Sequence, residues 1–242
     1  PMGDMLRRFW TPFLEASKLP GPDCDPVEVR LLGEDLVAYC DTQGRYGLLV
    51  DRCPHRGTPL YYGRNEENGI RCIYHGWKFD VEGRCVDMPS EPEASNFKQK
   101  VKVGAYPVRE LAGVLWTYMG PPQLIPEMPD FEWTRLPASH QNIVRYNQNC
   151  NWVQALEGDI DTSHGPFLHR GSFDYDLSLT EMDVKLISYD ASPRWIIQNT
   201  DFGMMMAAQR DSENPGMEYW RIHHWFLPYF TCLLYTSDAA DE

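Results

Sequence analysis

Two short stretches, each pairing one cysteine with one histidine, constrain this chain more than any other feature of its sequence. The first reads Cys53-Pro-His55-Arg-Gly and the second reads Cys72-Ile-Tyr-His75-Gly. Glycine beside such residues permits tight turns, so the four side chains can converge from two loop tips. A [2Fe–2S] cluster with two cysteines on one iron and two histidines on the other uses this set of ligands. The pattern therefore predicts such a cluster, held by Cys53, His55, Cys72 and His75.

A structural zinc ion is the main alternative for these four side chains. Zinc sites usually present two cysteines two to four residues apart, followed by two histidines three to five residues apart. Here each stretch carries one cysteine and one histidine, and Cys53 and His55 stand only two positions apart. This spacing fits zinc poorly, and four unrelated residues would not be expected to repeat it.

The composition excludes several classes of partner. The chain has 242 residues, 43% of them hydrophobic, and a net charge of −13. Phosphate backbones and anionic membranes select basic surfaces, so we expect neither nucleic acid nor a membrane surface as a partner. The sequence contains no apolar run long enough to span a membrane and no signal peptide at its start. Seven cysteines, an odd number, suggest a reducing compartment, and we expect a cytoplasmic location.

Strand-like runs separated by turn residues dominate the first half of the chain. We expect a segment with a short helix over 3–16 that Pro12 interrupts, within 1–26, and then an antiparallel β domain over 27–120. The expected strands are 27–32, 36–40, 46–50, 70–73, 77–79, 101–103, 106–109 and 114–118.

A proline-rich connector at 121–137 separates this domain from a second one at 138–231. Within the second domain we expect one helix at 151–162 and strands at 140–148, 182–187, 195–200, 204–209 and 218–227. The expected fold class is therefore α+β: an antiparallel β domain followed by the first part of a domain with a helix on an antiparallel sheet. The last segment, 232–242, matches the in-frame translation of a sequencing-library adapter, and we exclude it from the fold.

A second cluster of polar residues lies in the expected helix and just beyond it. On a continuous helix Glu157, Asp161 and His164 would share a sector of about 60°, while His169 would point about 140° away from His164. A break at Gly165-Pro166 would bring His169 back beside His164. Two histidines and a carboxylate suit a mononuclear non-haem Fe(II) site. A polar helix face with one buried histidine is an equal alternative for this stretch alone, but an electron-relaying cluster needs an acceptor, which favours iron.

These stretches resemble the oxygenase (α) component of Rieske non-haem iron aromatic-ring-hydroxylating oxygenases. The likeness is to the phthalate 4,5-dioxygenase-like branch, which also contains aryl O-demethylases. It is carried by the two cysteine–histidine stretches and by Asn151-Trp-Val-Gln-Ala-Leu-Glu157-Gly-Asp-Ile-Asp161 with His164 and His169.

The resemblance implies a role for each matching residue. Cys53, His55, Cys72 and His75 would bind the Rieske [2Fe–2S] cluster, and His164 and His169 would bind a mononuclear Fe(II). Asp161 would bridge an iron-ligand histidine of its own subunit and the residue matching His75 in a neighbouring subunit, within a homotrimer or a multiple of one. Glu157 falls where the family often has a polar residue near the iron. The family's third iron ligand is a carboxylate farther downstream than this chain extends, so we expect an incomplete, inactive iron site here.

The resemblance also implies a reaction. Electrons from an NAD(P)H-dependent reductase would pass through the cluster to Fe(II), and O₂ would be used to hydroxylate or O-demethylate an aromatic substrate, which we expect to be carboxylated. Candidate pocket residues are Trp195, Phe202, Met204, Met205, Met206 and Trp225, although such stripes are more often core. The alternative is a Rieske-type electron-transfer protein without oxygenase chemistry, which would be expected to end near Gly120.

Overall fold

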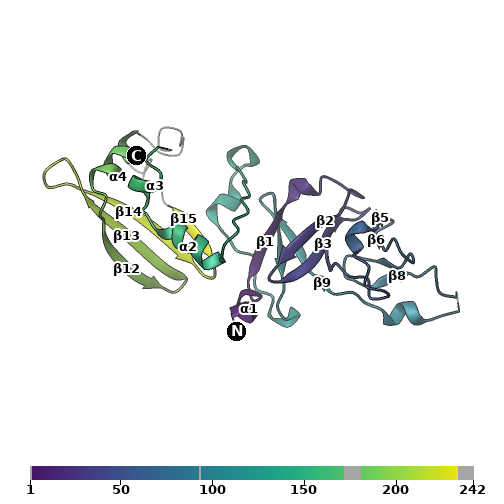
Figure 1. The fold of residues 1–242 in the computed structure, drawn as a ribbon. Coiled ribbons are helices and arrows are strands. Elements are labelled where there is room, and N and C mark those ends of the chain that lie inside the picture. The colour runs from purple at the N-terminus through teal and green to yellow at the C-terminus, as the bar shows by residue number, and fades with distance from the viewer. Residues whose placement is uncertain (1, 93, 172–180, 234–242) are drawn as a thin grey trace. The chain divides into compact units, whose positions relative to one another are not determined.

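The computed structural model describes residues 2–92, 94–171 and 181–233, with only the backbone at 181–183 and 233 (Figure 1). The chain divides into two compact units, 1–145 and 146–242. Among the described residues, none of the helices combines the length and the apolar character that crossing a membrane requires.

Three antiparallel sheets build the first unit. The first consists of β1 (Trp10–Glu15), β11 (Val114–Tyr118) and β10 (Val108–Leu111). The second consists of β2 (Val27–Leu31), β3 (Glu34–Cys40), β4 (Tyr46–Val50) and β9 (Ala105–Tyr106). The third consists of β5 (Arg64–Glu66), β6 (Gly69–Arg71), β7 (Lys78–Phe79) and β8 (Cys85–Asp87). A short helix α1 (Met2–Leu6) precedes them, and the 3-10 turns are η1 (Ala16–Lys18), η2 (Leu60–Tyr62), η3 (Phe97–Lys100), η4 (Pro122–Leu124), η5 (Glu132–Arg135) and η6 (Ala138–His140).

Strand β3 is buried on both faces and joins the two hydrophobic clusters of this unit. Because successive side chains of a strand point to opposite faces, Val37 and Tyr39 pack into one cluster, while Leu36 and Ala38 pack into the other. The cluster containing Val37 also includes Cys53 and Cys72. Two of the predicted metal ligands are therefore part of the hydrophobic core.

The second unit places helices against one antiparallel sheet (Figure 1). The sheet runs in chain order through β12 (Arg194–Thr200), β13 (Gly203–Asp211), β14 (Glu218–Phe226) and β15 (Phe230–Leu233). Helix α2 (Trp152–Ile160) contacts β14 and β15, and α4 (Glu181–Tyr189) contacts β13 and α3 (Gly165–Leu168). An antiparallel β unit followed by a helix-on-sheet unit confirms the expected α+β class.

Residues 10–15 are a strand, where we expected part of a helix that Pro12 breaks. Strand β1 lies at the edge of its sheet and pairs only with β11, and its register shifts between Pro12 and Leu14. An edge strand or a bulge is where a sheet tolerates proline, because one row of backbone donors is unpaired there. Val27 is therefore not the start of the fold in the first unit.

Three further local predictions were wrong. The expected strand at 182–187 belongs to helix α4, in which Ile187 is buried. A short apolar run is compatible with the period of a helix and with that of a strand. Here the segment packs against β13 as a helix. Residues 140–148 form no strand, and 101–103 contribute only an isolated bridge between Arg84 and Lys102.

Strand β15 extends two residues into the segment that we excluded from the fold. Cys232 pairs with His224, and the backbone of Leu233 pairs with His223. The remainder, 234–242, lies outside the described residues. The adapter origin of 232–242 stays a prediction.

We predict that a variant beginning at Val27 loses the fold of the first unit. It would lack Trp10, Phe13 and Leu14, which are all buried, and each such side chain contributes about 1.5–3 kcal/mol on burial. Their sum is comparable with the whole net stability of a typical domain, about 5–15 kcal/mol. A variant beginning at Phe9, which keeps β1, is the control. Equal thermal midpoints for the two variants, measured by circular dichroism, would show that β1 is dispensable.

Candidate metal centres

The two cysteine–histidine loops close by the same backbone geometry. The amide of Gly57 donates to the carbonyl of Cys53 at 2.8 Å, and the amide of Gly76 donates to the carbonyl of Cys72 at 3.0 Å. Gly57 and Gly76 have φ angles of 73° and 76°, which glycine adopts without strain. At Gly76 a Cβ atom would also lie 2.8 Å from Pro89 Cγ. Both loops thus require glycine four residues after the cysteine.

The four side chains of these loops converge. The rings of His55 and His75 lie 4.4 Å apart between centroids, and the thiol of Cys72 lies close enough to that of Cys53 to raise the pKa of Cys53. The Nδ1 atom of His55 is buried and has no hydrogen-bond partner among the described residues. A buried imidazole nitrogen without a partner is costly unless a ligand occupies it. The arrangement thus fits a group held by both cysteines and both histidines.

The electrostatics of the cysteine pair favour a bound cation. Burial, followed by the proximity of Cys72, raises the pKa of the Cys53 thiol to about 11, although the amides of His55 and Arg56 oppose this rise. Ionising both thiols is therefore unfavourable without a positive charge between them, and a metal ion supplies that charge. Burial, followed by the charge of His75, lowers the pKa of His55 and keeps its ring neutral, as metal ligation requires.

Trp77 fixes the orientation of the first histidine. Its indole ring stacks on His55 at 4.4 Å between centroids, with the two planes 7° apart. The indole is buried, and its Nε1 donates to Ser90 Oγ at 2.9 Å. One side of the His55 ring is thus held against the core.

Among the described residues, no three or more His, Cys, Asp or Glu side chains gather around the position of a single ion. Two ligands per metal is what a two-iron cluster requires of a protein, because sulfide completes each iron.

The second candidate centre is organised by Asp161, the residue that directly follows α2. Its Oδ1 accepts from the Ser163 amide at 2.8 Å, and its Oδ2 accepts from the His164 amide at 3.0 Å and pairs with His164 Nδ1 at 2.7 Å. Burial raises the pKa of Asp161, but these hydrogen bonds outweigh it and the net pKa is lowered. An ionised Asp161 assigns the proton to Nδ1 of His164 and leaves Nε2 available to a metal.

The structure brings His164 and His169 together, with ring centroids 5.0 Å apart. Our placement of the break between them was wrong, because α2 ends at Ile160 and the chain turns at Asp161, before Gly165. Gly165 and Pro166 instead begin α3, where proline is tolerated because its missing donor would be unpaired anyway. Glu157, Asp161 and His164 therefore do not share one face of a continuous helix, as we had expected, although Asp161 does pair with His164.

Glu157 has an exposed side chain on α2, and its backbone carbonyl accepts from the Asp161 amide at 3.2 Å. The role that the resemblance implies for its carboxylate stays a prediction.

Strand register sorts the candidate pocket residues between the two faces of the sheet. Trp195 pairs with Ala208, Met204 pairs with Trp225, and both Met206 and Ala208 are buried. Trp195, Met204, Met206 and Trp225 therefore share one face, and Met205 belongs to the opposite face. Phe202 precedes β13, and its ring stacks on Phe226.

Two buried polar residues that we did not predict from the sequence, Arg210 and His223, lie on the face that carries Met206. Arg210 Nη2 donates to the carbonyl of Thr162 at 3.0 Å and so holds the residue after Asp161. Burial lowers the pKa of His223 to about 4, and neither ring nitrogen has a hydrogen-bond partner among the described residues. The sequence pattern that could have predicted them is an even spacing along each strand, Arg210 from Met206 and His223 from Trp225, which places these residues on one face.

Two family models match this chain. The Rieske [2Fe-2S] domain model covers residues 9–107, and the model described as "LigXa C-terminal domain like" covers residues 117–238, half of the chain. The first match contains both cysteine–histidine loops, and the second contains Asp161, His164 and His169.

Curated relatives share substantial sequence identity. The 3-chlorobenzoate-3,4-dioxygenase oxygenase subunit of Comamonas testosteroni is 41% identical, over 100% of this chain and 55% of the relative. The phthalate 4,5-dioxygenase oxygenase subunit of Pseudomonas putida is 45% identical, over 87% of this chain and 49% of the relative. The chain thus spans about half the length of these relatives.

Solved structures share the fold. The crystal structure of dicamba monooxygenase bound to dicamba has a TM-score of 0.70 at 22% identity, over 92% of this chain and 64% of that one. The cofactors of such Rieske-type oxygenases are the Rieske [2Fe–2S] cluster and a mononuclear non-haem iron. With both family models matched in order, the chain belongs to the oxygenase (α) components of the Rieske non-haem iron aromatic-ring oxygenases.

Proposed function

We propose that this chain carries the cluster site and two iron ligands of an oxygenase component that hydroxylates or O-demethylates an aromatic substrate. The observation that carries the proposal is the Asp161–His164–His169 arrangement in the same chain as the two cysteine–histidine loops. An electron carrier without oxygenase chemistry would need the loops but not this second centre.

The residues of the chain divide the work between ligation and orientation. Cys53 and Cys72 would hold one iron of the cluster, and His55 and His75 would hold the other. His164, through Nε2, and His169 would bind the mononuclear iron, with Asp161 orienting His164 through its Nδ1 proton. When bound, the cluster supplies single electrons and the Fe(II) supplies open positions for O₂.

The names of the relatives support a carboxylated aromatic substrate. Chlorobenzoate and phthalate are aromatic carboxylates, and a third relative, from Sphingobium, is a 5,5'-dehydrodivanillate O-demethylase oxygenase subunit, 44% identical over 70% of this chain. An NAD(P)H-dependent reductase, a homotrimer and a cytoplasmic location belong to the same proposal. Asp161 would bridge subunits in that trimer, because its carboxylate can accept from imidazoles on two sides.

We predict that the purified chain binds two irons and two inorganic sulfides and gives a reduced-state EPR signal with the low average g typical of mixed histidine and cysteine ligation. Cys72→Ser should lose the cluster. Cys85→Ser is the matched control, because Cys85 is also buried in this core yet lies outside both loops. One bound zinc without sulfide in the unmodified chain would exclude the proposed cluster.

We predict that Asp161→Asn in the full-length oxygenase slows single-turnover oxidation of the cluster by O₂ and substrate about tenfold or more, the usual cost of removing a partner that orients a metal ligand. Both metals should remain bound, because asparagine keeps the shape and one acceptor. Asp159→Asn, two residues earlier in α2, should leave the rate unchanged. Oxidation of the cluster in Asp161→Asn at the unmodified rate would contradict the bridging role.

A further inference from the structure

Arg71 is a buried cation placed directly before a predicted cluster ligand. It is the last residue of β6, next to Cys72, and only 9% of its surface is exposed. Arginine is rarely buried to this extent unless its charge is paired and its donors are satisfied. The hydrogen-bond partners of Arg71 therefore indicate the structural role of its buried guanidinium.

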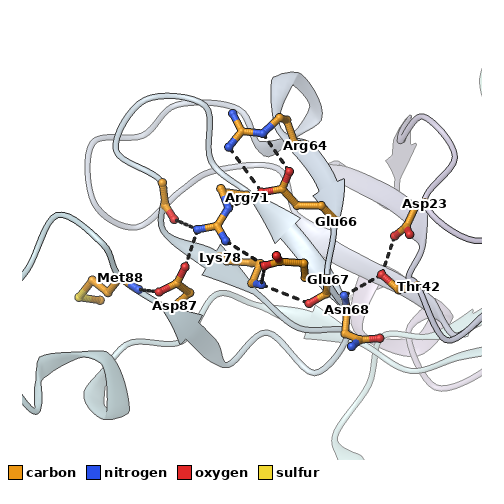
Figure 2. Close-up of polar contacts among 11 residues, drawn as sticks. Asp23, Thr42, Arg64, Glu66, Glu67, Asn68, Arg71, Lys78, Asp87 and Met88 are labelled. Atoms are coloured by element: carbon orange, nitrogen blue, oxygen red, sulfur yellow. Dashed lines mark hydrogen bonds and ion pairs between the residues drawn. The ribbon is translucent and has the colours of Figure 1, made fainter. Parts of the chain in front are cut away.

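The guanidinium of Arg71 connects the second cluster loop to two neighbouring strands (Figure 2). Its Nη1 donates to the carbonyl of Gly76 at 2.8 Å and to Asp87 Oδ2, in β8, at 2.6 Å. Its Nε donates to Glu66 Oε1, in β5, at 2.5 Å. One side chain thus ties the residue after His75 to the strands on either side of the loop.

Gly76 is held by two kinds of hydrogen bond: its carbonyl accepts from the Arg71 side chain, and its amide bonds to the backbone of the loop. The amide of Gly76 donates to the Cys72 carbonyl, and the amide of Cys72 donates to the Trp77 carbonyl at 2.8 Å. The Gly76 carbonyl, which belongs to the next peptide plane along the chain, accepts from Arg71. Both polar groups of Gly76 are therefore held, which fixes the turn that carries Cys72 and His75.

A second buried cation, Lys78, shares an acidic partner with Arg71. Lys78 Nζ donates to Glu67 Oε2 at 2.8 Å and to the Glu67 carbonyl at 3.2 Å (Figure 2). Glu67 Oε2 also lies 3.5 Å from Arg71 Nη2. Hydrogen bonding to Arg71 lowers the pKa of Asp87, and hydrogen bonds from Arg64 and then Arg71 lower that of Glu66. The carboxylates that hold the guanidinium therefore stay ionised near neutral pH.

We propose that Arg71 is a positioning residue for the second cluster loop, holding the Gly76 carbonyl so that Cys72 and His75 keep the geometry required for the cluster, while Asp87 and Glu66 orient the guanidinium. The proposal rests on the proposed cluster ligands. A guanidinium can reach three acceptors because its donors form a planar fork, which the ammonium of lysine lacks. The proposed role of Arg71 therefore depends on the planar shape of its guanidinium as well as on its positive charge.

The test compares Arg71→Lys, Arg71→Gln, Asp87→Asn and the control Arg64→Gln in the cluster-loaded protein. Arg64 also pairs with Glu66, through Nε at 3.0 Å, but its side chain is 60% exposed. The readouts are the g values and line widths of the reduced cluster, its reduction potential, and its rate of release to an iron chelator. We expect both Arg71 variants to broaden the EPR signal and release iron about tenfold faster, Asp87→Asn to do so in part, and Arg64→Gln to match the unmodified protein.

The lysine variant separates positioning from charge. If Arg71→Lys restores the unmodified line widths and release rate, the charge suffices and the proposal is wrong. Shifts of the reduction potential in opposite directions for Arg71→Gln and Asp87→Asn, with unchanged line widths and release rates, would also overturn it. Should Arg71→Gln fail to fold, Arg71→Lys and Asp87→Asn still decide. Absence of a cluster from the unmodified protein would instead contradict the proposed function.

Discussion

Convergence of two thiols and two imidazoles from separate loops is the constraint on which the first unit depends. Cys53 and Cys72 are both part of the hydrophobic cluster that also contains Val37, so the core and the metal site cannot be varied independently. A thiol pair buried among apolar side chains is costly to ionise. That cost makes a bound cation part of the stability of the unit as well as of its chemistry.

The histidines of the two candidate centres are oriented by different kinds of contact. At the first candidate centre packing and backbone turns orient the side chains: Trp77 stacks on His55, and the turns that close at Gly57 and Gly76 carry the predicted ligands. Around the second, one carboxylate does it, since Asp161 caps two backbone amides and also holds Nδ1 of His164. The first candidate centre therefore depends on the core around it, and the second depends on the Asp161 carboxylate.

The face of the second sheet that carries Met206 is not purely apolar. Arg210 and His223 are both buried there, and Arg210 holds the carbonyl of Thr162 beside Asp161. A buried charged group costs free energy unless it is hydrogen-bonded, so the bond from Arg210 favours one arrangement of the segment that carries the predicted iron ligands. The cysteine–histidine loops could be predicted from the sequence because their spacing is rare. An arginine and a histidine spaced along strands do not stand out in that way.

The sequence by itself determined the chemistry of this protein, and tertiary structure decided the geometry around it. Ligand type and spacing are local properties, so Cys53, His55, Cys72 and His75 could be named without a fold. The strand at 10–15 and the helix at 181–189 could not, because short segments satisfy both periodicities until a partner, β11 or β13, selects one. The contact of Arg71 with Gly76, Asp87 and Glu66 likewise exists only once three strands lie side by side.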